Sequence, residues 1–174
     1  QENDLKAGAD LIWKPSSDQQ ITASLNPDFG AIESDELVAN FSAIETLYSD
    51  KRAFFTENQS LFNVEGRGFA LLNTRRIGGN RRGQLEKPSD IDVAVKYLNT
   101  SSRLDFGLMA VREASQDREG ESIEGQNVVS GRYLLKGERG YLGQLVNWLE
   151  DGYSGEQALT SGLDFGHWFS GAEL

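Results

Sequence analysis

Apolar and polar residues alternate along most of this chain with a period of two, the spacing of β-strands that bury one face. The first two alternating segments are joined by Pro15 to Asp18, whose residues favour a tight turn, and they predict a hairpin. The whole pattern predicts an all-β, antiparallel up-and-down meander of about seven or eight strands. The predicted strands are residues 7–13, 21–25, 69–73, 91–97, 103–110, 129–135, 141–149 and 159–165.

One long stretch, residues 26–62, does not alternate. Apolar residues spaced by three and four across residues 35–47 predict a short amphipathic helix, with acidic residues near its start. Aromatic and leucine residues further along predict anchors that hold a loop against the core: Phe54, Phe55, Leu61 and Phe62. We therefore expect residues 26–62 to form an inset of loop and short helix within one domain that spans residues 1–174.

The predicted connections alternate in length. The links at 15–19, 99–102 and 137–140 are short, whereas those at 113–126 and 150–157 are longer. Alternate connections of a meander lie at the same end of the sheet, as do the short turns and the long loops of bacterial outer-membrane barrels. A soluble antiparallel sheet with one buried face alternates in the same way. The pattern alone leaves a membrane barrel and a soluble sheet open.

Aromatic residues stand near the ends of several predicted strands, where membrane barrels place amphipathic rings. Trp13, Tyr97 and Tyr141 are beside short links, and Trp148 and Tyr153 are beside a longer one. Soluble sheets also place aromatic residues at strand ends, so this second indication of a membrane interface does not decide between the two classes.

Composition narrows the partners. The formal net charge of −10, from 27 acidic and 17 basic residues, argues against a nucleic-acid partner, because phosphate binding needs a surplus of positive surface. The absence of cysteine excludes disulfides and thiolate metal sites. No run approaches the about 18 apolar residues of a membrane helix. Because the chain starts at Gln1 without a signal segment, we expect a mature product or a piece of a longer protein.

Several motifs resemble one known family. They are Asn26 to Gly30 (NPDFG), the acidic residues Glu33 and Asp35, Glu45-Thr46 followed by Tyr48, Lys51 to Glu57 (KRAFFTE), and Arg75 to Gly78 (RRIG). Together they resemble a family of unknown function from Gram-negative bacteria. Its members carry a predicted outer-membrane β-barrel, often after a domain similar to carbohydrate-binding family 9. Ala53 departs from this pattern, because the family usually has proline there.

The resemblance implies a location and an architecture, and it brings no established reaction. It implies that residues 1–174 are an incomplete outer-membrane-type β-barrel domain in contact with lipid. The implied role is a pore or scaffold component linked to the handling of a polysaccharide or other solute. Two other classes remain as alternatives: a soluble β-domain that binds a ligand or partner, and a carbohydrate-active hydrolase.

An acidic cluster in the inset has the oxygen ligands that a hard cation such as calcium prefers. Its spacing matches no EF-hand loop, so we favour solvated carboxylates at a helix start and predict neither a metal nor a cofactor. The cluster consists of Asp28, Glu33, Asp35 and Glu36.

A basic cluster follows the inset, at Arg75, Arg76, Arg81 and Arg82. Its guanidinium groups suit the capture of an anion such as a phosphate. We favour the alternative that they pair with acidic residues of the inset and fasten it to the wall, because charges inside barrels are usually paired. The candidates for binding or structural ion pairs are Asp28, Glu33, Asp35, Glu45, Lys51, Arg52, Glu57, Arg75 and Arg76.

No catalytic residue is predicted. Glycoside hydrolysis needs two carboxylates at a fixed separation, and Glu45, Glu57, Asp92 and Asp105 offer many pairs without indicating one. His167 accompanies no serine or cysteine motif that it would serve as a base. An enzyme is therefore the less favoured class.

Overall fold

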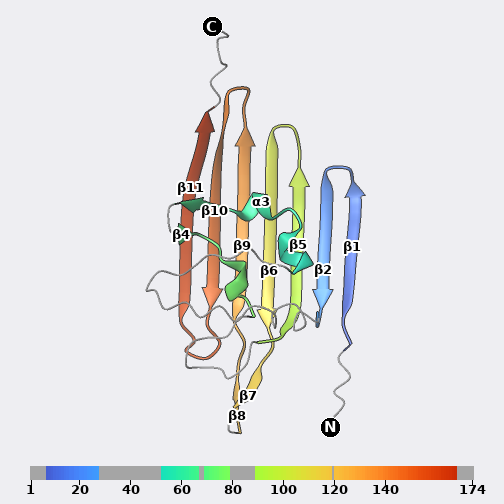
Figure 1. Ribbon diagram of the computed structural model, residues 1–174, viewed down its shortest axis with the longest axis vertical. Helices are drawn as coiled ribbons and strands as arrows, with labels where there is room; N and C mark the ends of the chain where they lie inside the picture. The colour runs from blue at the N-terminus through green and yellow to red at the C-terminus, as the bar shows by residue number, and fades with distance from the viewer. Residues whose placement is uncertain (1–6, 28–51, 67–68, 79–88, 119, 168–174) are drawn as a thin grey trace.

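The structure, a computed structural model, describes residues 7–27, 52–66, 69–78, 89–118 and 120–167. Its main feature is a seven-stranded antiparallel sheet whose strands lie side by side in chain order (Figure 1). The predicted all-β meander is confirmed. From one edge to the other, the strands are β1 (Ala9–Ser16), β2 (Gln19–Leu25), β5 (Ile91–Thr100), β6 (Leu104–Glu113), β9 (Asn127–Lys136), β10 (Gly140–Glu150) and β11 (Gln157–His167).

Short and longer connections lie at opposite ends of this sheet. Residues 17–18, 101–103 and 137–139 form short turns at one end, which we call the short-turn end (Figure 1). Residues 114–126 and 151–156 connect strands at the other end, which we call the looped end. The predicted alternation of connection lengths is confirmed.

The predicted strand at 69–73 is wrong in length and in partner. Only β4 (Phe69–Ala70) is a strand, and it pairs with β3 (Glu65–Gly66) in a small hairpin outside the main sheet. Beyond Ala70, the backbone nitrogen of Leu71 still donates to the carbonyl of Val64 at 3.0 Å, whereas its carbonyl accepts a hydrogen bond from the side chain of Asn147 at 2.9 Å. The end of this segment is therefore bound to the main sheet through a side chain and is not one of its strands.

The predicted polar loop at 113–126 also contains structure that was not expected. A separate hairpin forms there from β7 (Gln116–Arg118) and β8 (Glu121–Ile123). Each strand has only three residues, too few for a period of two to be recognised in the sequence.

The inset lies on one face of the sheet (Figure 1). We use this name for the described residues 52–66 and 69–78, so it continues beyond the predicted end at residue 62. The helix predicted at 35–47 lies outside the described residues, in which no helix is long and apolar enough to span a bilayer. The elements of the inset are α2 (Ala53–Thr56), α3 (Gln59–Phe62), the β3–β4 hairpin and the 3₁₀ helix η1 (Thr74–Arg76).

The hydrophobic core lies between the inset and the sheet. All four predicted anchors are buried there, which confirms the expectation that aromatic side chains hold the inset to the sheet. The rings of Phe54 and Phe55 meet edge to face, with centroids 5.1 Å apart. The core residues are Phe54, Phe55, Leu61, Phe62, Ile77, Ile91, Ala94, Leu98, Met109, Val111, Val128 and Leu145.

The register assigns alternate residues of each strand to two faces, because cross-strand partners point to the same side. One row of partners joins Thr22, Lys96, Met109, Ser130 and Asn147, all buried beneath the inset. We call this side the covered face.

The opposite side is the open face. It is apolar, and no described residue covers it. The large apolar residues exposed on it are Leu11, Trp13, Leu25, Val95, Leu104, Phe106, Leu108, Val129, Leu135, Leu142, Leu159, Leu163 and Phe165. Among the aromatic residues near strand ends, Trp13, Tyr97 and Trp148 point to the open face. Tyr141 instead points to the covered face, where its ring lies against Gly166.

Candidate functional site

The covered face binds the inset chiefly through long polar side chains that reach its backbone. Lys96 is only 2% exposed, and its ammonium group donates to the carbonyls of Phe54 at 2.5 Å and Glu57 at 2.6 Å. Its nitrogen also lies 5.0 Å from the centroid of the Phe54 ring. The Glu57 carboxylate accepts from Gln20 of β2 at 2.8 Å. Lys96 therefore satisfies carbonyls at the end of α2 and fixes that helix on the sheet.

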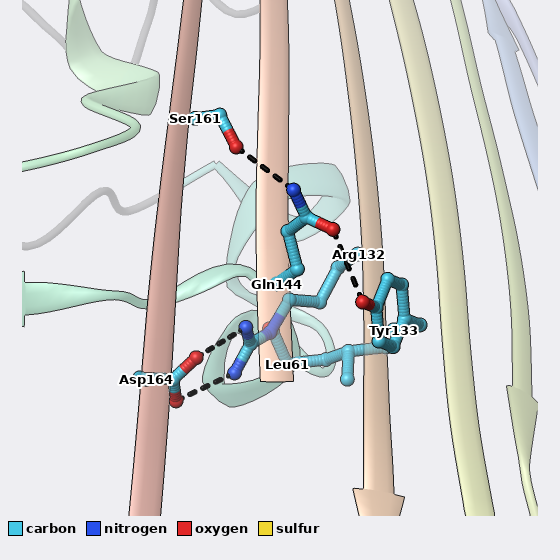
Figure 2. Close-up of polar contacts among 6 residues, drawn as sticks. All are labelled: Leu61, Arg132, Tyr133, Gln144, Ser161 and Asp164. Carbon is cyan, nitrogen blue, oxygen red and sulfur yellow. Dashed lines mark hydrogen bonds and ion pairs between the residues drawn. The ribbon is translucent and has the colours of Figure 1, made fainter. Parts of the chain in front are cut away.

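Arg132 of β9 fastens the next part of the inset. Its Nε donates to the carbonyl of Leu61 at 3.0 Å, and its two terminal nitrogens bind the Asp164 carboxylate of β11 at 2.5 and 2.8 Å (Figure 2). The Arg132 side chain is 4% exposed and that of Asp164 26%, so the pair is buried on the arginine side and partly accessible to solvent on the carboxylate side. The pair spans three strands and turns its third donor towards the inset.

Gly107 leaves the space that α3 occupies. A Cβ atom at this position would lie 2.7 Å from the Phe62 ring and 2.8 Å from a methyl carbon of Leu61. Such distances are too short for carbon atoms in contact, so any side chain on Gly107 would displace α3. On β10, Asn147 holds a later part of the inset through Leu71, as described above.

Two sequence motifs meet at one buried junction. Arg52 belongs to the 51–57 motif, and it donates to the carbonyls of Thr74 and Ile77 at 2.7 Å each. Its guanidinium carbon lies 4.2 Å from the centroid of the Phe55 ring. The second motif, residues 75–78, is thus fixed by the first.

Glu113, at the end of β6, closes this junction. Its carboxylate accepts from the backbone nitrogen of Gly78 at 2.8 Å and from that of Gln126 at 3.3 Å. The glycine has a φ of +75°, a conformation that other residues adopt only with strain. We call Arg52, Phe55, Thr74, Ile77, Gly78 and Glu113 the motif junction.

The predicted site residues fall into two groups. Arg52 is part of the motif junction, and Glu57 binds Gln20. Arg75 and Arg76 lie in η1. Because the predicted acidic partners Asp28, Glu33 and Glu45 lie outside the described residues, the pairing of Arg75 and Arg76 with them stays a prediction. The predicted residues outside the described part are Asp28, Glu33, Asp35, Glu36, Glu45, Lys51, Arg81 and Arg82.

Sequence reasoning missed the residues that do most of the fastening. They are Lys96, Glu113, Arg132 and Asn147. The available signal was a charged or amide side chain at the polar positions of otherwise apolar strands. That signal indicates a face, but it does not identify a partner that is far away in the chain.

Polar groups on the open face bind one another. The Tyr133 hydroxyl donates to the Gln144 amide oxygen, and the Gln144 amide nitrogen donates to the Ser161 hydroxyl, each at 3.1 Å (Figure 2). Figure 2 shows this chain of bonds running across β9, β10 and β11. These polar groups therefore need fewer hydrogen bonds to water.

The carboxylates of the covered face are also engaged. Asp105 binds Lys136 at 2.7 Å, and Asp164 binds Arg132. Among the described residues, no three histidine, aspartate or glutamate side chains gather as a metal site. The arrangement found here is suited to holding the inset in place.

The comparisons with known proteins identify a family. No curated protein and no solved structure gives a significant match. A family model described as a domain of unknown function, DUF5916, matches residues 1–105, more than half of the 174-residue chain. The matched region contains the inset and the strands β1, β2 and β5. It therefore includes the inset carbonyls that accept hydrogen bonds from the sheet. The chain accordingly belongs to the DUF5916 family, whose function is unknown.

Proposed function

We propose that the seven strands form part of the wall of an outer-membrane-type β-barrel in a Gram-negative bacterium. The open face would contact lipid, and the inset would occupy the interior. One observation carries this proposal: the face that no described residue covers is the apolar one, and the face with buried charged side chains is the covered one. A water-soluble sheet buries its apolar face and leaves its polar face in solvent.

The size of the open face strengthens the proposal. Phe165 is 81% exposed, Leu159 72% and Leu163 68%, and ten further exposed apolar residues lie on the same face, distributed over the other six strands. Each such side chain gains about 1.5–3 kcal/mol when it is fully removed from water. Contiguous apolar patches beyond a few hundred Å² mark contact with a membrane or a partner. The size of the open face therefore supports contact with lipid.

The charges have the distribution that such a wall needs. On the open face, Arg112 and Glu150 are register neighbours of Asn127 at the looped end, and the middle of the strands carries no charge. On the covered face, Arg132 and Asp164 are paired in the middle of the sheet. Barrels place charged groups inside and pair them, because a charge in hydrocarbon is expensive.

The inset gives the proposed barrel a filled interior on this side. Lys96, Arg132 and Asn147 all bind its backbone carbonyls, and the aromatic anchors are buried beneath it. These contacts favour a scaffold or a constricted pore over a wide water-filled channel along these strands. The lipid would be the direct partner of the open face, and any solute would pass beside the inset.

Tryptophan fluorescence in brominated lipid tests the proposal. Trp13 and Trp148 both point to the open face, and Phe can replace the other tryptophans to leave one reporter at a time. In vesicles of brominated phosphatidylcholine we expect strong quenching of both reporters. A matched control is Tyr141→Trp in a chain without other tryptophans, because Tyr141 points to the covered face and should be quenched less.

The alternatives give different results. A protein that is monodisperse in detergent-free buffer, with neither reporter quenched by vesicles, would contradict the proposal and favour a soluble binding domain. Hydrolysis of a glycan panel that disappears when one carboxylate is replaced would favour an enzyme. Quenching of both reporters, combined with detergent dependence, is the result we expect.

A further inference from the structure

The directions of the two edge strands limit how this wall is completed. Every neighbouring pair in the sheet is antiparallel, and the number of strands is seven. An odd number of alternating strands gives β1 and β11 the same direction, as their arrows show in Figure 1. A sheet that closes on itself with antiparallel pairing throughout needs an even number of strands. These two edges therefore cannot pair with each other in the antiparallel manner.

We propose that an odd number of additional β-strands completes the wall, and that β1 and β11 each pair antiparallel with one of them. The proposal rests on the barrel proposed above and specifies its partner. The partner is an extended segment that runs opposite to β1 at one edge or opposite to β11 at the other. It should alternate apolar residues towards lipid with polar residues towards the interior.

The β11 edge has the features of a template for pairing. Its 11 residues pair with β10 without a bulge, and they include no proline and no lysine. Sheet edges in soluble proteins are usually short or are interrupted by such residues, because an unpaired ladder promotes association. A long, regular edge is therefore suited to receive a further strand.

The β1 edge also lacks a neighbour among the described strands, and this leaves an apolar residue of the covered face exposed. Ile12 is a register partner of Thr22 and so belongs to the covered face, yet it is 58% exposed. Pro15 and a register shift interrupt the pairing of β1 only beside the turn at 17–18. The segment from Ala9 to Trp13 remains regular, so an additional strand and the interior that it encloses would cover both this edge and Ile12.

The connection lengths orient the missing strands. Both β1 and β11 run from the looped end to the short-turn end (Figure 1). In outer-membrane barrels the short turns are periplasmic and the longer loops are extracellular. The strands that pair with β1 and β11 would therefore run outwards, from the periplasmic side.

Paired proline substitutions test whether β1 is an edge in the full-length protein. The N–H groups of neighbouring residues in a strand point to opposite edges, and proline removes one of them. If a further strand pairs with β1, both Leu11→Pro and Ile12→Pro should abolish the folded, heat-modifiable form on gels. Val128→Pro and Val129→Pro in the central strand β9 give the reference for a strand that is paired on both sides. Loss of folding with only one of the two β1 substitutions would overturn the proposal.

Amide hydrogen exchange gives a second measurement that needs no disruptive variant. Consecutive amides at residues 158–165 of β11 should all exchange slowly, since each would lie in a ladder. Alternation of slow and fast amides along β11 would show an unpaired edge and overturn the proposal, while quenching of Trp148 by brominated lipid would still support a membrane wall.

Disulfide formation tests whether β1 and β11 pair directly with no strand between them, and cysteines can be placed at chosen positions because the native chain has none. If the barrel instead closes by parallel pairing of β1 with β11, Leu11→Cys should oxidise with one of Leu159→Cys, Leu163→Cys or Phe165→Cys. We expect no such disulfide, whereas the register partners Leu11→Cys and Ala23→Cys should form one readily. Any disulfide between β1 and β11 within one chain would overturn the odd number without affecting the lipid contact of the open face.

Discussion

The two faces of the sheet are built from alternate residues of the same strands, yet they follow opposite rules. The covered face carries Lys96, Arg132 and Asp164, and it binds a folded segment through them. The open face carries leucine, valine and aromatic residues with no described protein layer over them. In a soluble sheet the apolar face is buried and the polar face is exposed. Here the charged side chains of Lys96 and Arg132 are buried and the large apolar side chains of the open face are exposed. The comparison supports the proposal that the open face contacts lipid.

The two faces also satisfy their polar groups differently. On the covered face, side-chain donors bind carbonyls of the inset, so that sheet and inset complete each other. On the open face, Tyr133, Gln144 and Ser161 bind one another across three strands. The first arrangement depends on a distant segment of the chain, whereas the second is complete within the sheet. Substitutions should therefore cost more on the covered face unless they bring a charge into lipid.

The largest effect is expected at the buried ion pair. Arg132→Met removes the partner of Asp164 and the donor to the Leu61 carbonyl, so it should lower the free energy of unfolding by about 3–5 kcal/mol. Urea unfolding of the protein in lipid vesicles measures this. The control is Lys136→Met, which breaks the more exposed pair with Asp105 and should cost only about 0.2–1 kcal/mol. Equal costs would show that Arg132 is not buried as described.

A charge on the open face should have the next largest effect. Leu108 is a register partner of Tyr97 and Gly131 in the middle of the sheet, so Leu108→Arg should cost about 2–4 kcal/mol in a bilayer. In a soluble sheet the same change at an exposed leucine would be nearly neutral. Tyr153→Arg, in the connection at 151–156, is the control and should be tolerated in either case. A neutral Leu108→Arg in vesicles would contradict lipid contact.

The same substitution of a glycine by valine can be compared on the two faces. Gly107→Val on the covered face should push α3 off the sheet and cost about 1–3 kcal/mol or more. Gly131→Val on the open face meets no atom within 4 Å and should be neutral or stabilising, because valine favours strands. Protease cleavage of the inset, compared between the two variants, measures its displacement. Similar cleavage rates would remove the role assigned to Gly107.

The smallest effect is expected for the hydrogen-bonded chain on the open face. Tyr133→Phe removes the donor to Gln144 and leaves its amide oxygen unpaired, which should cost about 0.6 kcal/mol in lipid. Gln144→Leu removes both bonds and adds apolar surface, so it should be neutral or stabilising in vesicles. Unfolding in urea distinguishes the two. A loss above that of Arg132→Met would show that this chain of bonds, and not the covered face, holds the sheet.

Sequence reasoning recovered the sheet because alternation is a local property. The strands at 91–97 and 103–110 form β5 and β6 with longer ends, and the apolar anchors at Phe54 and Phe62 are buried as expected. The strand at 69–73 was predicted too long, and its sequence could not reveal that Leu71 binds Asn147, a residue much later in the chain.

The candidate site was recovered only in part, for the same physical reason. The motifs at 51–57 and 75–78 were recognised separately, and charge alone suggested that their arginines bind acidic side chains. Arg52 donates to two backbone carbonyls, contacts that have no signature in a sequence. Glu113 was missed because its partner is the backbone nitrogen of Gly78. Contacts that end on the backbone therefore need coordinates to be found.

Spin labelling along β11 tests the central claim most directly. Single cysteines at residues 158–165 would be unambiguous, because the native chain has none. With the protein in vesicles, we predict that labels at the odd-numbered positions, which share the open face with Leu159 and Phe165, are accessible to oxygen and shielded from a water-soluble nickel chelate. Labels at the even-numbered positions should show lower accessibility to oxygen. Odd-numbered positions that the nickel chelate reaches as freely as water would contradict the claim that the open face contacts lipid.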